Sequence, residues 1–79
     1  MGGMTHAMPA TIHRLQPPIE VRTPLGQGRA LFLIDYGIDV NTIWLVCVTK
    51  PNDSSPLIKN SVRHFDSNDI TVVPNLMLP

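Results

Sequence analysis

Two apolar runs near the middle of the chain, residues 31–34 and 43–48, limit the fold more than any other feature. Turn-forming residues bound each run, and the runs combine leucine, β-branched and aromatic side chains, which is typical of β-strands. Both alternate sets of side chains are apolar, so each strand can bury both of its faces. A chain of 79 residues has room for one compact core. The runs therefore predict a single small all-β domain.

Alternation and turn residues predict three further strands around these two runs. Segments in which apolar and polar side chains alternate are typical of strands with one buried face, and Pro, Gly, Asn and Asp separate them. No segment has a convincing long helical period, which favours a small barrel or sandwich. The five predicted strands cover residues 19–23, 29–36, 41–50, 61–65 and 70–73.

A Thr-Pro-x-Gly-x-Gly element at residues 23–28 precedes the first apolar run. This element resembles the opening of many small SH3-like barrels, and the resemblance covers roughly residues 19–73. Ser67-Asn68-Asp69 is similar to the single helical turn between the last two strands of such barrels. The resemblance implies a five-stranded SH3-like barrel, a fold that hosts peptide binders, nucleic-acid binders and assembly modules alike. The stretch also resembles small uncharacterised bacterial and phage proteins, which suggests a phage or mobile-element origin.

The predicted domain organisation has three parts. Residues 1–18 are expected to form an extended N-terminal arm, partly ordered or flexible, because Pro17-Pro18 forces an extended exit. Within the arm, segment 10–15 could form a turn of helix or a strand, and its apolar side chains favour packing. Residues 19–74 form the predicted SH3-like β-barrel, and residues 75–79 form a C-terminal tail.

Charge and cysteine usage restrict the partners and the compartment. Six basic residues balance six acidic ones, so no electrostatic funnel draws the chain toward nucleic acid or anionic membranes. The low charge also leaves little to keep copies apart, which favours self-association. Cys47 is the single cysteine, which excludes an intramolecular disulfide. The start lacks a signal-peptide pattern and no apolar run approaches a membrane span, so we expect a cytoplasmic protein without membrane contact.

No constellation of residues predicts catalysis, cofactor binding or a metal site. Gly26 and Gly28 lack the flanking helix and the further Gly or Lys of a phosphate-binding loop, so they indicate a turn. His6, His13 and His64 could each ligate a metal, but a site needs three or four convergent groups. The sequence therefore predicts a non-enzymatic chain with no cofactor.

The two-sided apolar strands have two explanations. Strong curvature and the N-terminal arm could cover the second face. Alternatively, an outward strip of Phe32, Ile34, Trp44 and Val46 meets a second subunit or another protein. The second explanation predicts a protein-interaction or assembly module that forms homo-oligomers or docks on a protein partner.

The alternative function is a nucleic-acid-binding accessory domain. Arg22, Arg29 and Arg63 could gather into a rim that contacts phosphates. The whole basic inventory is small and is cancelled by acids, which weakens this alternative.

Overall fold

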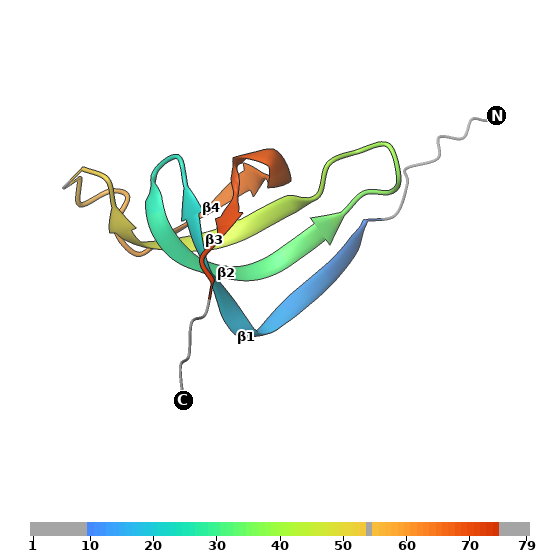
Figure 1. The fold of residues 1–79 in the computed structure, drawn as a ribbon, viewed down its shortest axis with the longest axis horizontal. Coiled ribbons are helices and arrows are strands. Elements are labelled where there is room, and N and C mark those ends of the chain that lie inside the picture. Colours follow the sequence, from blue (N-terminus) through green and yellow to red (C-terminus); the bar gives the residue numbers. More distant parts are fainter. Residues whose placement is uncertain (1–9, 54, 75–79) are drawn as a thin grey trace.

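The computed structural model describes residues 10–53 and 55–74, which form one antiparallel five-stranded sheet with the order β4-β3-β2-β1-β5 (Figure 1). The predicted all-β class and the five strands are confirmed. A single 3-10 turn, η1, joins the last two strands, at the position that the family resemblance implied. The strands are β1 (Thr11–Thr23), β2 (Gly26–Asp35), β3 (Ile43–Pro51), β4 (Ser61–Asp66) and β5 (Thr71–Val72), and η1 covers Ser67–Asp69.

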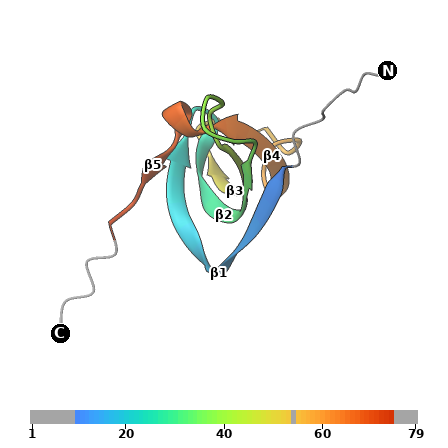
Figure 2. The ribbon, with the colours of Figure 1, turned by 90° about the vertical axis from the view of Figure 1, so that its right-hand side faces the viewer.

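The sheet curls strongly about one face but does not close into a barrel (Figure 2). Within the described ranges the two outermost strands, β4 and β5, pair with one neighbour each. One reason is the length of β5, which pairs with β1 at only two positions before Pro74 follows. The structure therefore has a curved open sheet in place of the predicted closed barrel.

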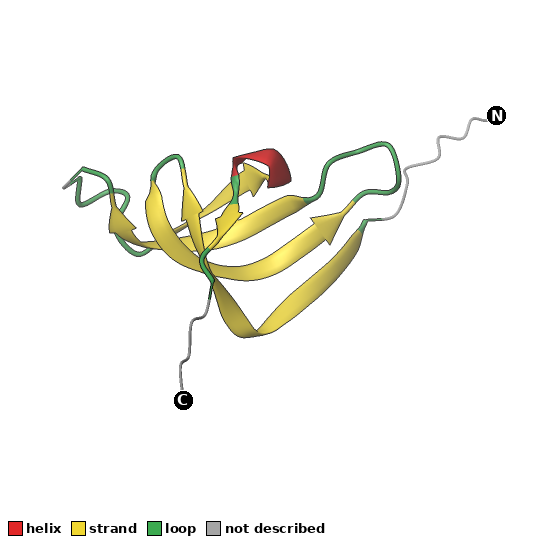
Figure 3. Ribbon diagram, in the orientation of Figure 1, coloured by secondary structure: helices red, strands yellow, loops and turns green. Residues whose placement is uncertain are grey.

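Strand β1 is longer than the alternation predicted and begins at Thr11 instead of Ile19. Residues 11–14 pair with residues 32–35 of β2, so segment 10–15 is mainly strand and not a helical turn. The register breaks across residues 15–18, where two prolines lack the N–H that a ladder requires. This break divides β1 into two arms that form a V in Figures 2 and 3. The remaining residues of the predicted arm, 1–9, and the predicted tail, 75–79, lie outside the described residues.

The hairpin between β1 and β2 explains the two glycines of the Thr-Pro-x-Gly-x-Gly element. Thr23 Oγ1 accepts hydrogen bonds from the N–H groups of Leu25, at 3.1 Å, and Gly26, at 3.2 Å. Gly26 has a φ of +136°, which favours glycine. At Gly28 an added Cβ would lie 2.2 Å from the carbonyl oxygen of Cys47, so only glycine fits the close approach of β2 to β3. Gly26 therefore serves the turn that the sequence indicated, whereas Gly28 lies inside β2 and serves the close approach of two strands.

The fully buried core consists of small side chains. Among the described hydrophobic residues, Val21, Ala30, Val46 and Val48 are completely buried. Larger side chains pack against this core but stay partly exposed, including Leu15, Ile19, Trp44, Phe65 and Ile70. Fully burying one large apolar side chain contributes about 1.5–3 kcal/mol to stability. Further burial of these partly exposed side chains would therefore add to the stability of the fold.

Asp66 links the end of β4 to two other segments. Its carboxylate accepts a hydrogen bond from the Asn68 backbone N–H at 2.8 Å, which caps η1. It also accepts from the Asn41 side chain in the β2–β3 loop at 3.1 Å. The hydrogen bonds from Asn68 and then Asn41 lower the pKa of Asp66. Asp66 therefore caps the turn and ties it to the β2–β3 loop.

Candidate interaction surface

The pairing register assigns each side chain to one of the two faces of the sheet, because residues directly opposite each other share a face. The core residues Val21, Ala30 and Val46 define the inner face. Trp44 and Phe65 are opposite each other and pack against this core, so they also lie on the inner face. The opposite side is named here the outer face.

A register shift in β2 divides the predicted interface strip between the two faces. Ala30 is opposite Val46, but the next aligned pair is Phe32 with Leu45, which leaves Leu31 as an extra residue in β2. Phe32 and Ile34 consequently lie on the outer face. Trp44 and Val46 lie on the inner face, where Val46 is completely buried. The four side chains therefore do not form one strip, which corrects the prediction from alternation alone.

The outer face carries a different apolar surface that spans four neighbouring strands. Ile12, Ile34 and Ile43 are directly opposite one another across three strands. Phe32 and Leu45 form the adjacent row, and Cys47 faces Val62 in the row after that. Side chains in such rows are about 4.5–5.5 Å apart at their Cβ atoms, so the surface is continuous. We call this surface the outer apolar patch, and it consists of Ile12, Phe32, Ile34, Ile43, Leu45 and Val62.

This outer apolar patch is accessible at its two ends. The side chain of Ile12 is 64% exposed and that of Val62 is 55% exposed, whereas the four members between them are half-buried. Polar side chains border the patch, because Arg14 and His64 continue the row of Phe32 and Leu45, and Asp66 continues the row of isoleucines. An apolar surface with a polar rim is typical of a protein-interaction site.

The three predicted rim arginines do not gather on one face. Arg29 lies on the outer face, and its Nε contacts Glu20 Oε1 at 3.0 Å. Hydrogen bonds from Gln27 and then Arg29 lower the pKa of Glu20. Arg22 lies on the same face of β1, whereas Arg63 is opposite Val46 and therefore belongs to the inner face. The pairing register thus does not bring the three arginines together into the rim that the nucleic-acid-binding alternative requires.

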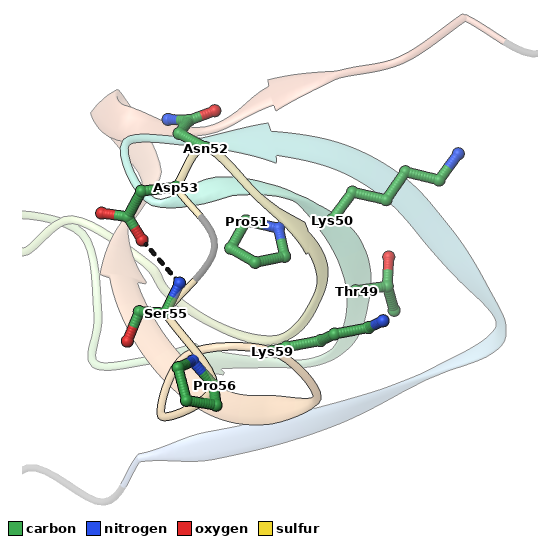
Figure 4. Close-up of a pocket in the computed structure, with 8 residues that line it drawn as sticks. All are labelled: Thr49, Lys50, Pro51, Asn52, Asp53, Ser55, Pro56 and Lys59. Atoms are coloured by element: carbon green, nitrogen blue, oxygen red, sulfur yellow. Dashed lines mark hydrogen bonds between the residues drawn. The ribbon is translucent and has the colours of Figure 1, made fainter.

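A shallow hollow of about 580 Å³ lies beside the β3–β4 connection (Figure 4). The ammonium groups of Lys50 and Lys59 extend toward one side, and Asp53 lies on the other. The Asp53 carboxylate accepts a hydrogen bond from the Ser55 backbone N–H at 3.1 Å, which organises the loop. The side chains that line the hollow do not converge on a common point, so this arrangement suggests no chemistry.

The described histidines lie apart. His13 is on the inner face and His64 is on the outer face of an edge strand, while His6 lies outside the described residues. Within residues 10–53 and 55–74, no group of three or more His, Cys, Asp or Glu side chains could hold a metal ion. In the same part of the chain, no helix has the length and apolarity needed to cross a membrane.

Comparison with known proteins gives no relative, since no family model, no curated protein and no solved structure matches the chain. Four members of the outer apolar patch, Ile12, Ile43, Leu45 and Val62, were not predicted. Alternation in residues 43–48 contains Ile43 and Leu45 as the second apolar set, so that signal was present. Ile12 and Val62 required knowledge of strand pairing.

Proposed function

We propose that the chain is a non-enzymatic assembly module that self-associates by packing its outer apolar patch against the same patch of a second copy. The observation that carries this proposal is the exposed, polar-rimmed apolar surface on the side of the sheet opposite the core. The core of one chain is small, and a second sheet packed about 10 Å away would bury the unused apolar side chains.

The charges at the edge of the patch are compatible with a second copy. Asp66 and Glu20 supply two acids, and Arg14 and Arg29 supply two cations on the same face. The whole chain has a formal net charge of +0. Two copies that face each other can therefore place opposite charges together without net repulsion.

We further propose that the fold is an open relative of SH3-like barrels. The Thr-Pro-x-Gly-x-Gly hairpin and the 3-10 turn between β4 and β5 support this relationship. A phage or mobile-element origin stays a prediction from the sequence.

The test compares two substitutions of exposed isoleucines. Ile12→Lys places a charge in the patch, and Ile38→Lys makes the same change at a loop residue that is 99% exposed and lies between β2 and β3. Both should leave the monomer folded, because both side chains face solvent. Complete burial of one isoleucine contributes about 1.5–3 kcal/mol, so Ile12→Lys should weaken self-association at least roughly tenfold.

Sedimentation equilibrium over a range of chain concentrations measures this effect. We expect wild type and Ile38→Lys to associate equally and Ile12→Lys to lose the part of the association that the outer apolar patch provides. A wild-type chain that stays monomeric at millimolar concentration, or equal association of all three proteins, would contradict the proposed function.

A further inference from the structure

We propose a second contact between copies: the free edge of β4 pairs antiparallel with the same edge of another chain, about a two-fold axis at His64. This contact uses backbone groups and is separate from the outer apolar patch. It goes beyond the proposed function because it assigns a specific register and a specific strand.

Hydrogen bonds at the two ends of β4 show which backbone groups face away from the sheet. The Ser67 N–H donates to the Thr42 carbonyl at 2.9 Å, immediately after the strand. Before the strand, the Asn60 N–H also donates to the Val48 carbonyl, but Asn60 has a φ of +64° and lies outside the regular ladder, which begins with Ser61 opposite Val48. The Ser67 bond therefore sets the alternation within β4. Backbone groups alternate between the two sides of an antiparallel strand. The groups that face the free edge therefore belong to Val62, His64 and Asp66.

The β4 edge lacks the features that usually prevent edge pairing. Its six residues contain no proline and no lysine, and its pairing with β3 has no irregularity between Ser61 and Asp66. The opposite edge is different, because β5 has only two residues and Pro74 follows them closely. The middle of β1 contains Pro17 and Pro18. Strand β4 therefore offers a regular edge of six residues to a further strand.

The side chains select one register for two copies of β4. With His64 opposite His64, Val62 lies opposite Asp66 and Arg63 lies opposite Phe65 of the other copy. Asp66 of each copy is then the diagonal neighbour of His64 in the other, which pairs an acid with a base. Arg63 beside Phe65 allows a cation–π contact on the inner face. Moving the axis to Arg63 would place two guanidinium groups opposite each other, which is unfavourable.

This pairing has a consequence for the outer face. A two-fold axis normal to the sheet keeps the outer faces of both copies on the same side. Val62 lies on the β4 strand at the end of the outer apolar patch. The two patches would therefore lie next to each other on one ten-stranded sheet.

The test uses two substitutions of His64 that differ in the backbone. The His64 N–H is directed toward the free edge, so His64→Pro removes a donor that β3 does not use, and proline is tolerated at such edge positions. His64→Ala removes the same imidazole but keeps the N–H. Circular dichroism checks that both variants are folded.

Sedimentation velocity and amide hydrogen exchange give the two readouts. In wild type, we expect the His64 amide to exchange about tenfold more slowly at a concentration where nine-tenths of the chains are paired than in the dilute monomer. His64→Ala should retain this edge-paired dimer and His64→Pro should lose it. Concentration-independent exchange at His64 in wild type would overturn the proposal, even if His64→Pro fails to fold. Equal association of wild type and a folded His64→Pro would also overturn it.

The outer-patch variant separates the two contacts. Ile12→Lys should keep the concentration-dependent protection of His64, because residue 12 is remote from the free edge of β4 in the pairing order. Loss of this protection in folded Ile12→Lys would contradict an independent edge contact. Failure of the outer-face association alone would leave the protection of His64 unchanged.

Discussion

The close approach of β2 to β3 at Gly28 makes Gly28→Ala the most direct test of the sheet register. The added Cβ would lie 2.2 Å from the Cys47 carbonyl oxygen, whereas ordinary contact begins at 3.4 Å. It would also lie 2.9 Å from Val46 Cγ1, a fully buried side chain. The obstacle is mainly backbone in a central strand, so relief requires the strands to separate.

The size of the effect follows from two opposing terms. Overpacking in a well-packed core costs about 1–3 kcal/mol, and the backbone contact at Gly28 places this variant at the upper end. Replacing glycine reduces the entropy of the unfolded chain, which returns roughly 0.4–1 kcal/mol. We therefore expect a net loss of about 2 kcal/mol. For a domain of this length, that loss lowers the midpoint of thermal unfolding by roughly 8–16 °C.

Thermal unfolding followed by circular dichroism at one low concentration measures this change. Gln27→Ala is the control, since it alters the adjacent residue of β2 and removes only the partly buried hydrogen bond to Glu20, which contributes about 1 kcal/mol or less. If Gly28→Ala melts within about 3 °C of wild type, the pairing of Gly28 with Val48 is wrong.

Two further predictions concern single side chains. Trp44 Nε1 is buried without a hydrogen-bond partner among the described atoms, which costs about 1–3 kcal/mol. Trp44→Phe removes this polar atom and should therefore change the free energy of unfolding in urea by less than about 1 kcal/mol. Trp44→Ala also removes the packed ring and should lower the free energy of unfolding by about 3–5 kcal/mol. Equal losses would contradict this account. Hydrogen bonds from Gln27 and then Arg29 lower the pKa of Glu20 in the folded chain, so these contacts stabilise the fold above the unfolded pKa and their contribution is lost as the pH falls through the folded value. Because the pair is exposed, wild type should lose less than about 1 kcal/mol more than Glu20→Gln between about pH 6 and pH 3, and a larger difference in acid titration would refute a surface pair.

The sequence predicted the strands well where local chemistry decides the structure. The apolar run at residues 43–48 identified the segment that became β3, alternation identified the segment that became β4, and Ser67-Asn68-Asp69 indicated the turn at η1. Gly26 and Gly28 were interpreted as turn glycines, and the structure confirms this at Gly26, whereas Gly28 lies inside β2. These features depend on neighbours along the chain, which a single sequence contains.

Features that depend on pairing between strands were not predictable in the same way. Residues 11–14 contain little alternation of their own and become strand because β2 is long enough to pair with them. Barrel closure depends on how far β5 extends along β1, and the sequence does not specify this length. The faces of Phe32 and Trp44 could not be assigned together, because the extra residue at Leu31 changes the parity of β2 relative to β3.

The extra residue at Leu31 has an implication for the reliability of folding. In most half-buried strands, a one-residue slip in the pairing exposes the apolar side chains and buries the polar ones. The free-energy cost of this exchange disfavours the slipped alignment. Residues 31–34 are apolar at every position, and a slipped strand would meet no such penalty. Discrimination between alignments must come from shape, through the bare backbone of Gly28 against Cys47. The absence of a Cβ at Gly28 thus determines the alignment of β2 with β3, and with it the side chains of β2 that lie on the outer face.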